Sequence, residues 1–315
     1  MKKIVSTLVI LIFFSWIFYF IYYHREDFYK IATISFSYLL PALVLSFCSY
    51  VGNGNFLRLM LKKYSIVISL QESTSLALLT TFFNTMMPMQ SGAALRAVYL
   101  KKKHHFNYTS FFATLYAIYV IVYFNVACIG IVVSTLIYSK YNIISYFVCG
   151  LLILTFFVFG FIFIVPVELP KQKRRFLQLF KKMTDSWNQI RKDKKFVFQL
   201  QSLQLVNFTI RTLLMYLVFL SMGLSVPIEK VIYFQIITSI MSFINITPGA
   251  IGIQETLFLL VGQLFSMKPA DILIMSLLLR SVSLSVNFTC APFASYILFK
   301  KNLFALKREL TSNKT

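Results

Sequence analysis

The chain has few acidic residues and few of the side chains that usually bind metals. Its 315 residues include 10 acidic residues, 3 histidines and 4 cysteines. The cysteines lie in separate apolar stretches without CxxC spacing, so neither a disulfide framework nor a zinc site is indicated. No DxD-like carboxylate pair, HxxxH pair or glycine-rich phosphate loop occurs, which argues against metal-dependent transfer and direct use of a nucleotide. We therefore expect no metal, no cofactor and no catalytic residues.

Long hydrophobic runs fill most of the sequence. Hydrophobic residues make up 58% of the chain and charged residues 13%. This composition predicts an all-α polytopic membrane protein, a single integral membrane domain over residues 1–315 with no room for an ordinary soluble catalytic domain. The first run follows two lysines and has no small-residue cleavage site, so we interpret it as a retained signal anchor. About six full spans are expected, at residues 4–23, 31–51, 109–138, 142–167, 198–222 and 270–299.

Basic residues give the chain a formal net charge of +21, and they lie between the hydrophobic runs. In a soluble protein this charge would suggest nucleic acid. Here the positive-inside rule explains it better, and we expect no nucleic-acid partner. The rule places the N- and C-termini on the cytoplasmic side of a bacterial-type cytoplasmic membrane. The basic segments expected on that side are Lys2 and Lys3, Arg58 to Lys63, Lys101 to Lys103, the cluster from 171 to 195, and Lys300 to Arg308.

Two regions are too long for one helix and are interrupted near the middle. Residues 65–100 and 230–267 each contain a central proline, and each predicts a broken or re-entrant helical hairpin. Proline ends one half-helix, glycine allows close packing at the start of the next, and asparagine can bond the freed backbone groups. Two ordinary proline kinks would explain the matched spacing less well. The residues of the two breaks are Asn84, Pro88 and Gly92, and Asn245, Pro248, Gly249 and Gly252.

The two hairpins divide the chain into halves of opposite orientation. The charge pattern lets the first hairpin start and end on the cytoplasmic side and the second on the outer side. We therefore predict two inverted-topology repeats, residues 1–167 and 198–315, an architecture typical of transporters. A basic amphipathic connector over 168–197 joins them, and its apolar stripe suits the anionic cytoplasmic leaflet.

Four charged residues fall within the hydrophobic regions, where an ionisable group needs a partner or water. Arginine offers phosphate a planar fork of donors, so we predict that these residues form a binding site for a lipid phosphate or another anion. A salt bridge between the glutamate and one arginine is the structural alternative, and it still leaves surplus positive charge. The four residues are Arg96, Arg211, Glu255 and Arg280.

These motifs resemble those of a known family. The stretch from Thr247 to Glu255, and the first break followed by Arg96, are similar to motifs of the lysylphosphatidylglycerol synthase transmembrane-region family, also called flippase-like membrane proteins. The resemblance covers essentially the whole chain. The first motif departs from the family pattern, because Ala93 and Ala94 stand where an acidic residue is frequent. Residues 116–119 read Tyr-Ala-Ile-Tyr where a Glu-Arg pair is common, so a different substrate or a divergent subgroup is implied.

The resemblance implies a lipid-translocating membrane region, or a small relative associated with polyprenyl-linked glycan pathways. Large members of the family carry a C-terminal aminoacyl-transferase domain. This chain ends at Thr315, so we expect no lysylphosphatidylglycerol synthase activity.

The sequence therefore favours a transporter over an enzyme. We expect a flippase or scramblase that moves an anionic phospholipid or polyprenyl-phosphate-linked lipid between leaflets. Its arginines would bind phosphate, and Glu255 would balance charge or change its protonation. Two alternatives remain open: a membrane-embedded transferase acting on a lipid-linked sugar, and a non-catalytic partner of envelope or glycan-synthesis proteins. The expected partners are an anionic lipid and the bilayer, and the oligomeric state is left open.

Overall fold

The computed structural model describes residues 34–87, 91–168, 175–241 and 248–300. These residues form helices and no strands, which confirms the predicted all-α class. The helices are α3 (Phe36–Lys62), α4 (Leu70–Met86), α5 (Ser91–His104), α6 (Tyr108–Tyr141), α7 (Tyr146–Ile164), α8 (Arg175–Lys192), α9 (Lys194–Ser221), α10 (Ile228–Met241), the short 3-10 helix η2 (Pro248–Ala250), α11 (Ile253–Leu264) and α12 (Pro269–Phe299).

Five helices, α3, α6, α7, α9 and α12, are long and apolar enough to cross a membrane. They correspond to five of the six predicted spans, and the chain is a multi-pass membrane protein. The remaining span, residues 4–23, lies outside the described residues. Helix α3 continues to Lys62, beyond the expected end at 51, and Gly54 lets this extension pack closely on α4. A Cβ atom at Gly54 would lie 2.7 Å from the backbone nitrogen of Thr74.

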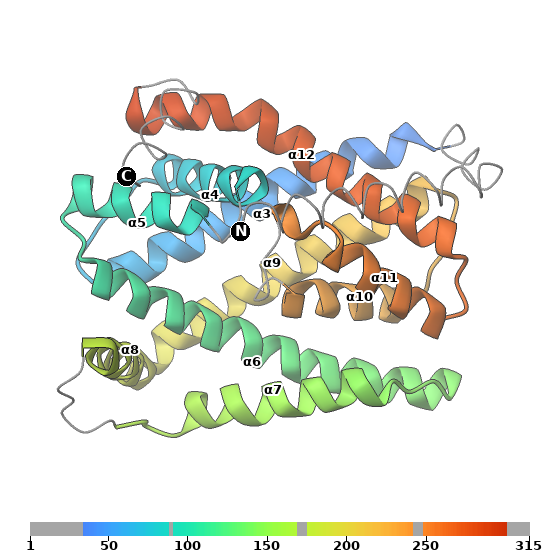
Figure 1. The fold of residues 1–315 in the computed structure, drawn as a ribbon, viewed down its shortest axis with the longest axis horizontal. Coiled ribbons are helices and arrows are strands. Elements are labelled where there is room, and N and C mark those ends of the chain that lie inside the picture. The colour runs from blue at the N-terminus through green and yellow to red at the C-terminus, as the bar shows by residue number, and fades with distance from the viewer. Residues whose placement is uncertain (1–33, 88–90, 169–174, 242–247, 301–315) are drawn as a thin grey trace, which may run out of the picture.

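Helices α3 and α9 lie side by side and run antiparallel (Figure 1). At one end of the pair, the backbone nitrogen of Ser35 donates to the carbonyl of Ser221 at 2.8 Å. At the other end, Lys63 Nζ forms an ion pair with Asp193 Oδ2 at 2.9 Å, and the same aspartate accepts from the backbone nitrogen of Phe196. The Lys63 ammonium holds the pKa of Asp193 below its usual value. These contacts show that the chain traverses the molecule in opposite directions in the two helices.

The helix pairs α4–α5 and α10–α11 form two hairpins at opposite ends of the molecule (Figure 1). Helices α4 and α5 contain 17 and 14 residues, and α10 and α11 contain 14 and 12. At ~1.5 Å per residue the arms are about 18 to 26 Å long, short of the ~30 Å hydrocarbon core of a bilayer. The described part of each arm is therefore shorter than this core, as expected for hairpins that turn back inside the bundle.

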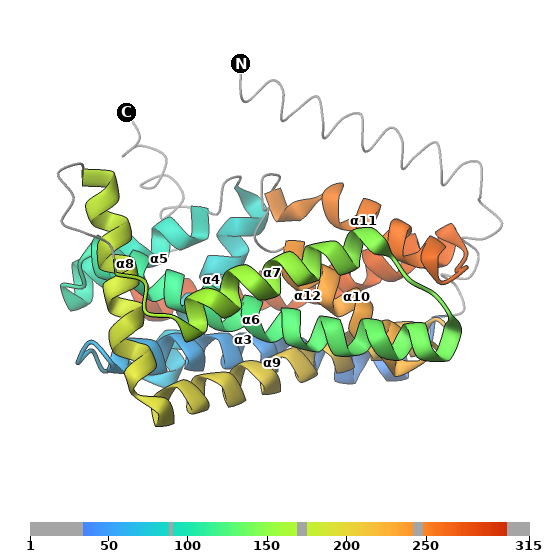
Figure 2. The ribbon, with the colours of Figure 1, turned by 90° about the horizontal axis from the view of Figure 1, so that it is seen from below.

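Helix α8 packs much of its apolar stripe against the protein rather than leaving it for lipid. It crosses the bundle at the end where α9 begins (Figure 2). Trp187 is 1% exposed and donates from Nε1 to the carbonyl of Ile162 at 2.8 Å, and Ile190 is equally buried. Phe180 stays at the surface. The stripe is therefore divided between the core and the exterior.

Candidate functional site

The first break, between α4 and α5, is held together by the amide of Asn84. Its Oδ1 accepts a hydrogen bond from the backbone nitrogen of Gly92 at 2.8 Å, which satisfies one of the free donors at the start of α5. Ser91 Oγ donates to the carbonyl of Phe83 at 3.0 Å. A Cβ atom at Gly92 would lie 1.9 Å from the carbonyl oxygen of Thr80, so only glycine fits this close approach of α5 to α4. Pro88 lies outside the described residues.

The second break, between α10 and α11, uses two glycines with positive φ. Gly249 within η2 has φ 61°, and Gly252 before α11 has φ 88°. Glu255 accepts from the backbone nitrogen of Gly252 at 2.8 Å through Oε2, and this contact caps α11. Arg280 Nη1 of α12 donates to the carbonyl of Gly249 at 2.9 Å. Asn245 lies outside the described residues, and Pro248 begins η2.

Glu255 and Arg280 form an ion pair that fastens this break to α12. Arg280 Nη2 donates to Glu255 Oε1 at 2.5 Å, and Ser276 Oγ lies 3.5 Å from the same oxygen. The Glu255 side chain is 3% exposed and that of Arg280 is 18% exposed. The salt bridge that the sequence left as an alternative is therefore present, and each of the two side chains neutralises the other.

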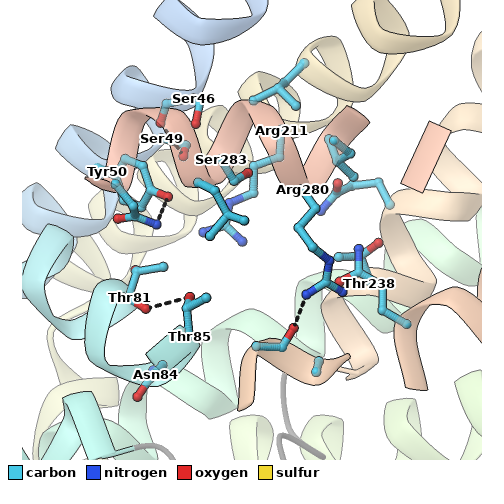
Figure 3. A pocket seen from close by; sticks show the side chains of 18 residues that line it. Ser46, Ser49, Tyr50, Thr81, Asn84, Thr85, Arg211, Thr238, Arg280 and Ser283 are labelled. Atoms are coloured by element: carbon cyan, nitrogen blue, oxygen red, sulfur yellow. Dashed lines mark hydrogen bonds between the residues drawn. The ribbon is translucent and has the colours of Figure 1, made fainter. Parts of the chain in front are cut away.

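The tips of the two hairpins meet at a polar cavity. A Cβ atom at Gly249 would lie 3.3 Å from Thr85 Cγ2, so the second break lies against the end of α4. The space beside this contact, named here the central cavity, has a volume of about 310 Å³ (Figure 3). Residues of α3, α4, α9, α10, η2, α11 and α12 line it. Hydroxyl and amide groups are frequent in this lining, among them Ser46, Ser49, Thr81, Asn84, Thr238 and Ser283.

A second cavity of about 320 Å³ adjoins the first. We name it the α6-side cavity because residues of α6 line it together with parts of α3, α4, α5, α9 and α10. Both cavities are lined by Thr81, Asn84, Arg211 and Gln235, and they meet at these side chains. Arg96 lines the α6-side cavity only. Two neighbouring polar cavities with a shared wall thus lie between the first hairpin and the second break.

All three arginines expected at the site line these cavities, and Arg211 lines both. Arg280 is neutralised by Glu255, whereas Arg96 donates from Nε to the hydroxyl of Thr80 at 3.1 Å. No carboxylate lines either cavity, and neither Arg96 nor Arg211 forms an ion pair with a described residue. Among the described residues, the two cavities are therefore lined by two arginines whose positive charge has no carboxylate partner.

The guanidinium of Arg211 points into the space between Tyr50, Thr85 and Arg280 (Figure 3). Hydroxyl groups and a guanidinium facing one small volume can surround an oxyanion with donors. The structure thus brings Arg96, Arg211 and Arg280 to two neighbouring cavities, while Glu255 pairs with Arg280 beside the central cavity.

Most of the polar residues that line the cavities were not among those expected from the sequence, and these include the amide and phenol side chains of Tyr50, Gln235 and Asn287. Tyr50 and Asn287 are buried, and Asn287 Nδ2 donates to the Tyr50 hydroxyl at 2.8 Å. Gln235 lines both cavities. In the sequence each of these residues is a single amide or phenol side chain within an apolar run. The same pattern occurs where membrane helices simply pack against one another.

A metal site is not evident in the part of the chain that the structure describes. Within residues 34–87, 91–168, 175–241 and 248–300, no group of three or more His, Cys, Asp or Glu residues could hold an ion.

The sequence was also compared with known proteins. The profile of a family described as Lysylphosphatidylglycerol synthase TM region matches residues 3–290, which include both hairpins and all five long apolar helices up to the last turns of α12. This match confirms the resemblance drawn from the two break motifs. A comparison with curated proteins found no match.

Proposed function

The chain belongs to the lysylphosphatidylglycerol synthase TM-region family, and we propose that it is a lipid translocase. It moves an anionic phospholipid or polyprenyl-phosphate-linked lipid between the leaflets of a bacterial-type cytoplasmic membrane. One observation carries the proposal: Arg211 lies at the junction of two polar cavities, without a carboxylate partner among the described residues. A phosphate group supplies the missing negative charge and accepts two parallel hydrogen bonds from a guanidinium.

The two cavities give the phosphate two positions that share one arginine. In the α6-side cavity Arg96 and Arg211 both face it, and in the central cavity Arg211 faces it beside Arg280. Arg280 is already paired with Glu255, so its main task is to hold the second break in place. The phosphate can therefore pass from one cavity to the other without losing contact with Arg211.

The departures from the family pattern fit this arrangement. Ala93 and Ala94 occupy positions where an acidic residue is frequent in the family, and Tyr119 lies in a segment where a Glu-Arg pair is common. Tyr119 lines the α6-side cavity together with Arg96. With these carboxylates absent, the charge of Arg96 is left for the substrate.

In the proposed cycle the lipid reaches the site through the movement of two inverted repeats. The order long helix, hairpin, long helix occurs twice, as α3, α4–α5, α6 and as α9, α10–α11, α12, with α3 antiparallel to α9. A glutamate begins each hairpin and accepts from a tyrosine hydroxyl: Glu72 from Tyr99 at 2.6 Å, and Glu229 from Tyr141 at 2.8 Å. Rocking of one repeat against the other exposes the arginines first to one side and then to the other. The basic end of α5 marks the cytoplasmic side.

Vesicle reconstitution tests the function. Purified protein is placed in liposomes that contain fluorescent phosphatidylglycerol or a fluorescent prenyl phosphate, and a quencher that cannot cross the membrane reports movement between leaflets. A hydrogen bond to a charged group contributes about 1.5–3 kcal/mol, so Arg211→Gln should slow movement by about 10- to 100-fold. Arg58→Gln is the matched control, because Arg58 is exposed near the end of α3 and its loss removes the same charge.

The proposal fails if neither anionic lipid moves faster in protein-containing vesicles than in empty ones. Movement that is equally fast in wild type and in a folded Arg211→Gln variant would remove Arg211 from the site. Normal cellular pathway activity with Arg96 and Arg211 both neutralised would favour the non-catalytic partner instead.

A further inference from the structure

An apolar groove opens at the protein surface between α3, α4 and α12. Its volume is about 500 Å³, and apolar atoms form almost all of its wall. Phe47 of α3 and Phe293 of α12 are 40% and 69% exposed, so the groove faces the surroundings of the bundle. Leu78 of α4 and Cys290 and Ala294 of α12 also line it.

The same three helices line the central cavity, and the two spaces follow one another along α4 and α12, while Phe47 of the groove and Ser46 of the cavity are adjacent residues of α3. On α4, Leu78 of the groove is followed one turn later by Thr81 of the cavity. On α12, Asn287 of the cavity precedes Cys290 of the groove by the same interval, about 5 Å along a helix axis. The polar space and the apolar space are thus neighbours within one three-helix corner.

Tyr50 forms the boundary between them. Its ring belongs to the apolar cluster that includes Leu78 and Ala294, with Cys290 packed against it. Its hydroxyl accepts the hydrogen bond from Asn287 Nδ2 and lines the central cavity. The other amide atom of Asn287, Oδ1, is buried without a partner among the described residues. Tyr50 and Asn287 therefore form part of the wall between the polar space and the groove.

We infer that the groove holds the hydrocarbon chain of the lipid whose phosphate occupies the central cavity. This inference rests on the proposed function and specifies its substrate as an amphiphile that enters sideways between α3, α4 and α12. The charge of Arg211 selects the anionic head, and the apolar wall keeps the chain out of the polar space. Cavities of this volume are at the small end for ligand sites, so they suit a phosphate with a small head group rather than a large glycan.

Photo-crosslinking tests the groove directly. Phosphatidylglycerol, a prenyl phosphate and phosphatidylcholine, each with a diazirine on its hydrocarbon chain, are reconstituted with the protein, irradiated, and mapped by mass spectrometry. Any lipid labels the outer surface, for example around Leu136 of α6, which is 55% exposed. We expect at least one anionic probe to label the segments around Leu78 and Cys290 several-fold more than phosphatidylcholine does. In Arg211→Gln this excess should disappear, whereas in Arg58→Gln it should remain.

Labelling that is the same for all three heads overturns the inference, because the groove would then be an ordinary lipid-facing surface. An excess that persists in Arg211→Gln overturns it as well, since the head group would not be held in the central cavity. If Arg211→Gln does not fold, competition in wild type decides: unlabelled phosphatidylglycerol or prenyl phosphate, but not phosphatidylcholine, should reduce groove labelling. Crosslinking reports occupancy without movement, so head-dependent labelling in a protein that moves no lipid would reject the translocase and keep the groove.

Discussion

Replacing Glu255 by glutamine should destabilise the protein and at the same time strengthen anion binding. The substitution removes the negative charge that Arg280 faces at 2.5 Å. Removing one partner of a buried ion pair costs about 3–5 kcal/mol. We expect the lower end, because glutamine can still accept from the backbone nitrogen of Gly252 and because Arg280 is partly exposed to the central cavity.

The gain in anion binding has the same cause. Without the carboxylate, Arg280 becomes a second uncompensated cation in the central cavity beside Arg211. One further hydrogen bond between a guanidinium and phosphate contributes about 1.5–3 kcal/mol, so the dissociation constant for phosphatidylglycerol should fall about 10- to 100-fold.

Two assays in detergent check the two effects. Denaturant unfolding of wild type, Glu255→Gln, Arg280→Gln and the double variant gives a double-mutant cycle, in which we expect a coupling energy of about 1–3 kcal/mol. Fluorescence titration with labelled phosphatidylglycerol gives the affinities. Additive stability losses would show that the ion pair contributes nothing, and weaker binding in Glu255→Gln would show that Glu255 does not restrain Arg280.

Three further substitutions address the breaks and the α3–α9 contact. Gly92→Ala should prevent stable folding, measured as loss of monodisperse protein in detergent, because the new Cβ atom would lie 1.9 Å from the carbonyl oxygen of Thr80. Asn84→Ala should lower the free energy of unfolding by about 1–3 kcal/mol, since it leaves the backbone nitrogen of Gly92 without its acceptor. The lowered pKa of Asp193 means that its ion pair with Lys63 stabilises the folded state above about pH 4 and is lost as the pH falls through the lowered pKa. Wild type should therefore lose more thermal stability between pH 6 and pH 3 than Asp193→Asn does, and equal losses would contradict the assignment.

Hydrophobic runs were enough to predict the long helices, and the helix-breaking residues were enough to predict the hairpins. The helix ends were predicted less well where a helix continues into polar sequence. Helix α3 extends through Gly52 and Gly54 to Lys62, because the close packing allowed by Gly54 stabilises residues that would otherwise be read as a loop. Local composition cannot report such support from a neighbouring helix.

The sequence identified the charged residues of the candidate site but not which of them form an ion pair. Glu255 could have met any of three arginines, and only the fold shows that it pairs with Arg280, 25 residues further along the chain. The contact between Tyr50 and Asn287 joins residues 237 positions apart. Neither side chain is charged, so the sequence alone does not mark either as a candidate site residue. The partners of buried amide and phenol groups can be identified only once the packing of their helices is known.

The contacts at the two ends of the first hairpin indicate how it moves in the proposed transport cycle. At the end where α4 begins and α5 ends, Glu72 Oε1 lies 3.1 Å from Lys103 Nζ and 2.7 Å from His104 Nε2, so an ion pair and a hydrogen bond join the two helices there. At its inner end the tip meets the second break where Thr85 lies against Gly249. In the proposed cycle, in which one repeat rocks against the other, the contacts of Glu72 keep the start of α4 and the end of α5 together, since charged hydrogen bonds are roughly twice as strong as neutral ones. The tip holds the α4 side chains that line both cavities beside Arg211. We therefore expect the rocking to change the wall between the two cavities at the tip of the first hairpin.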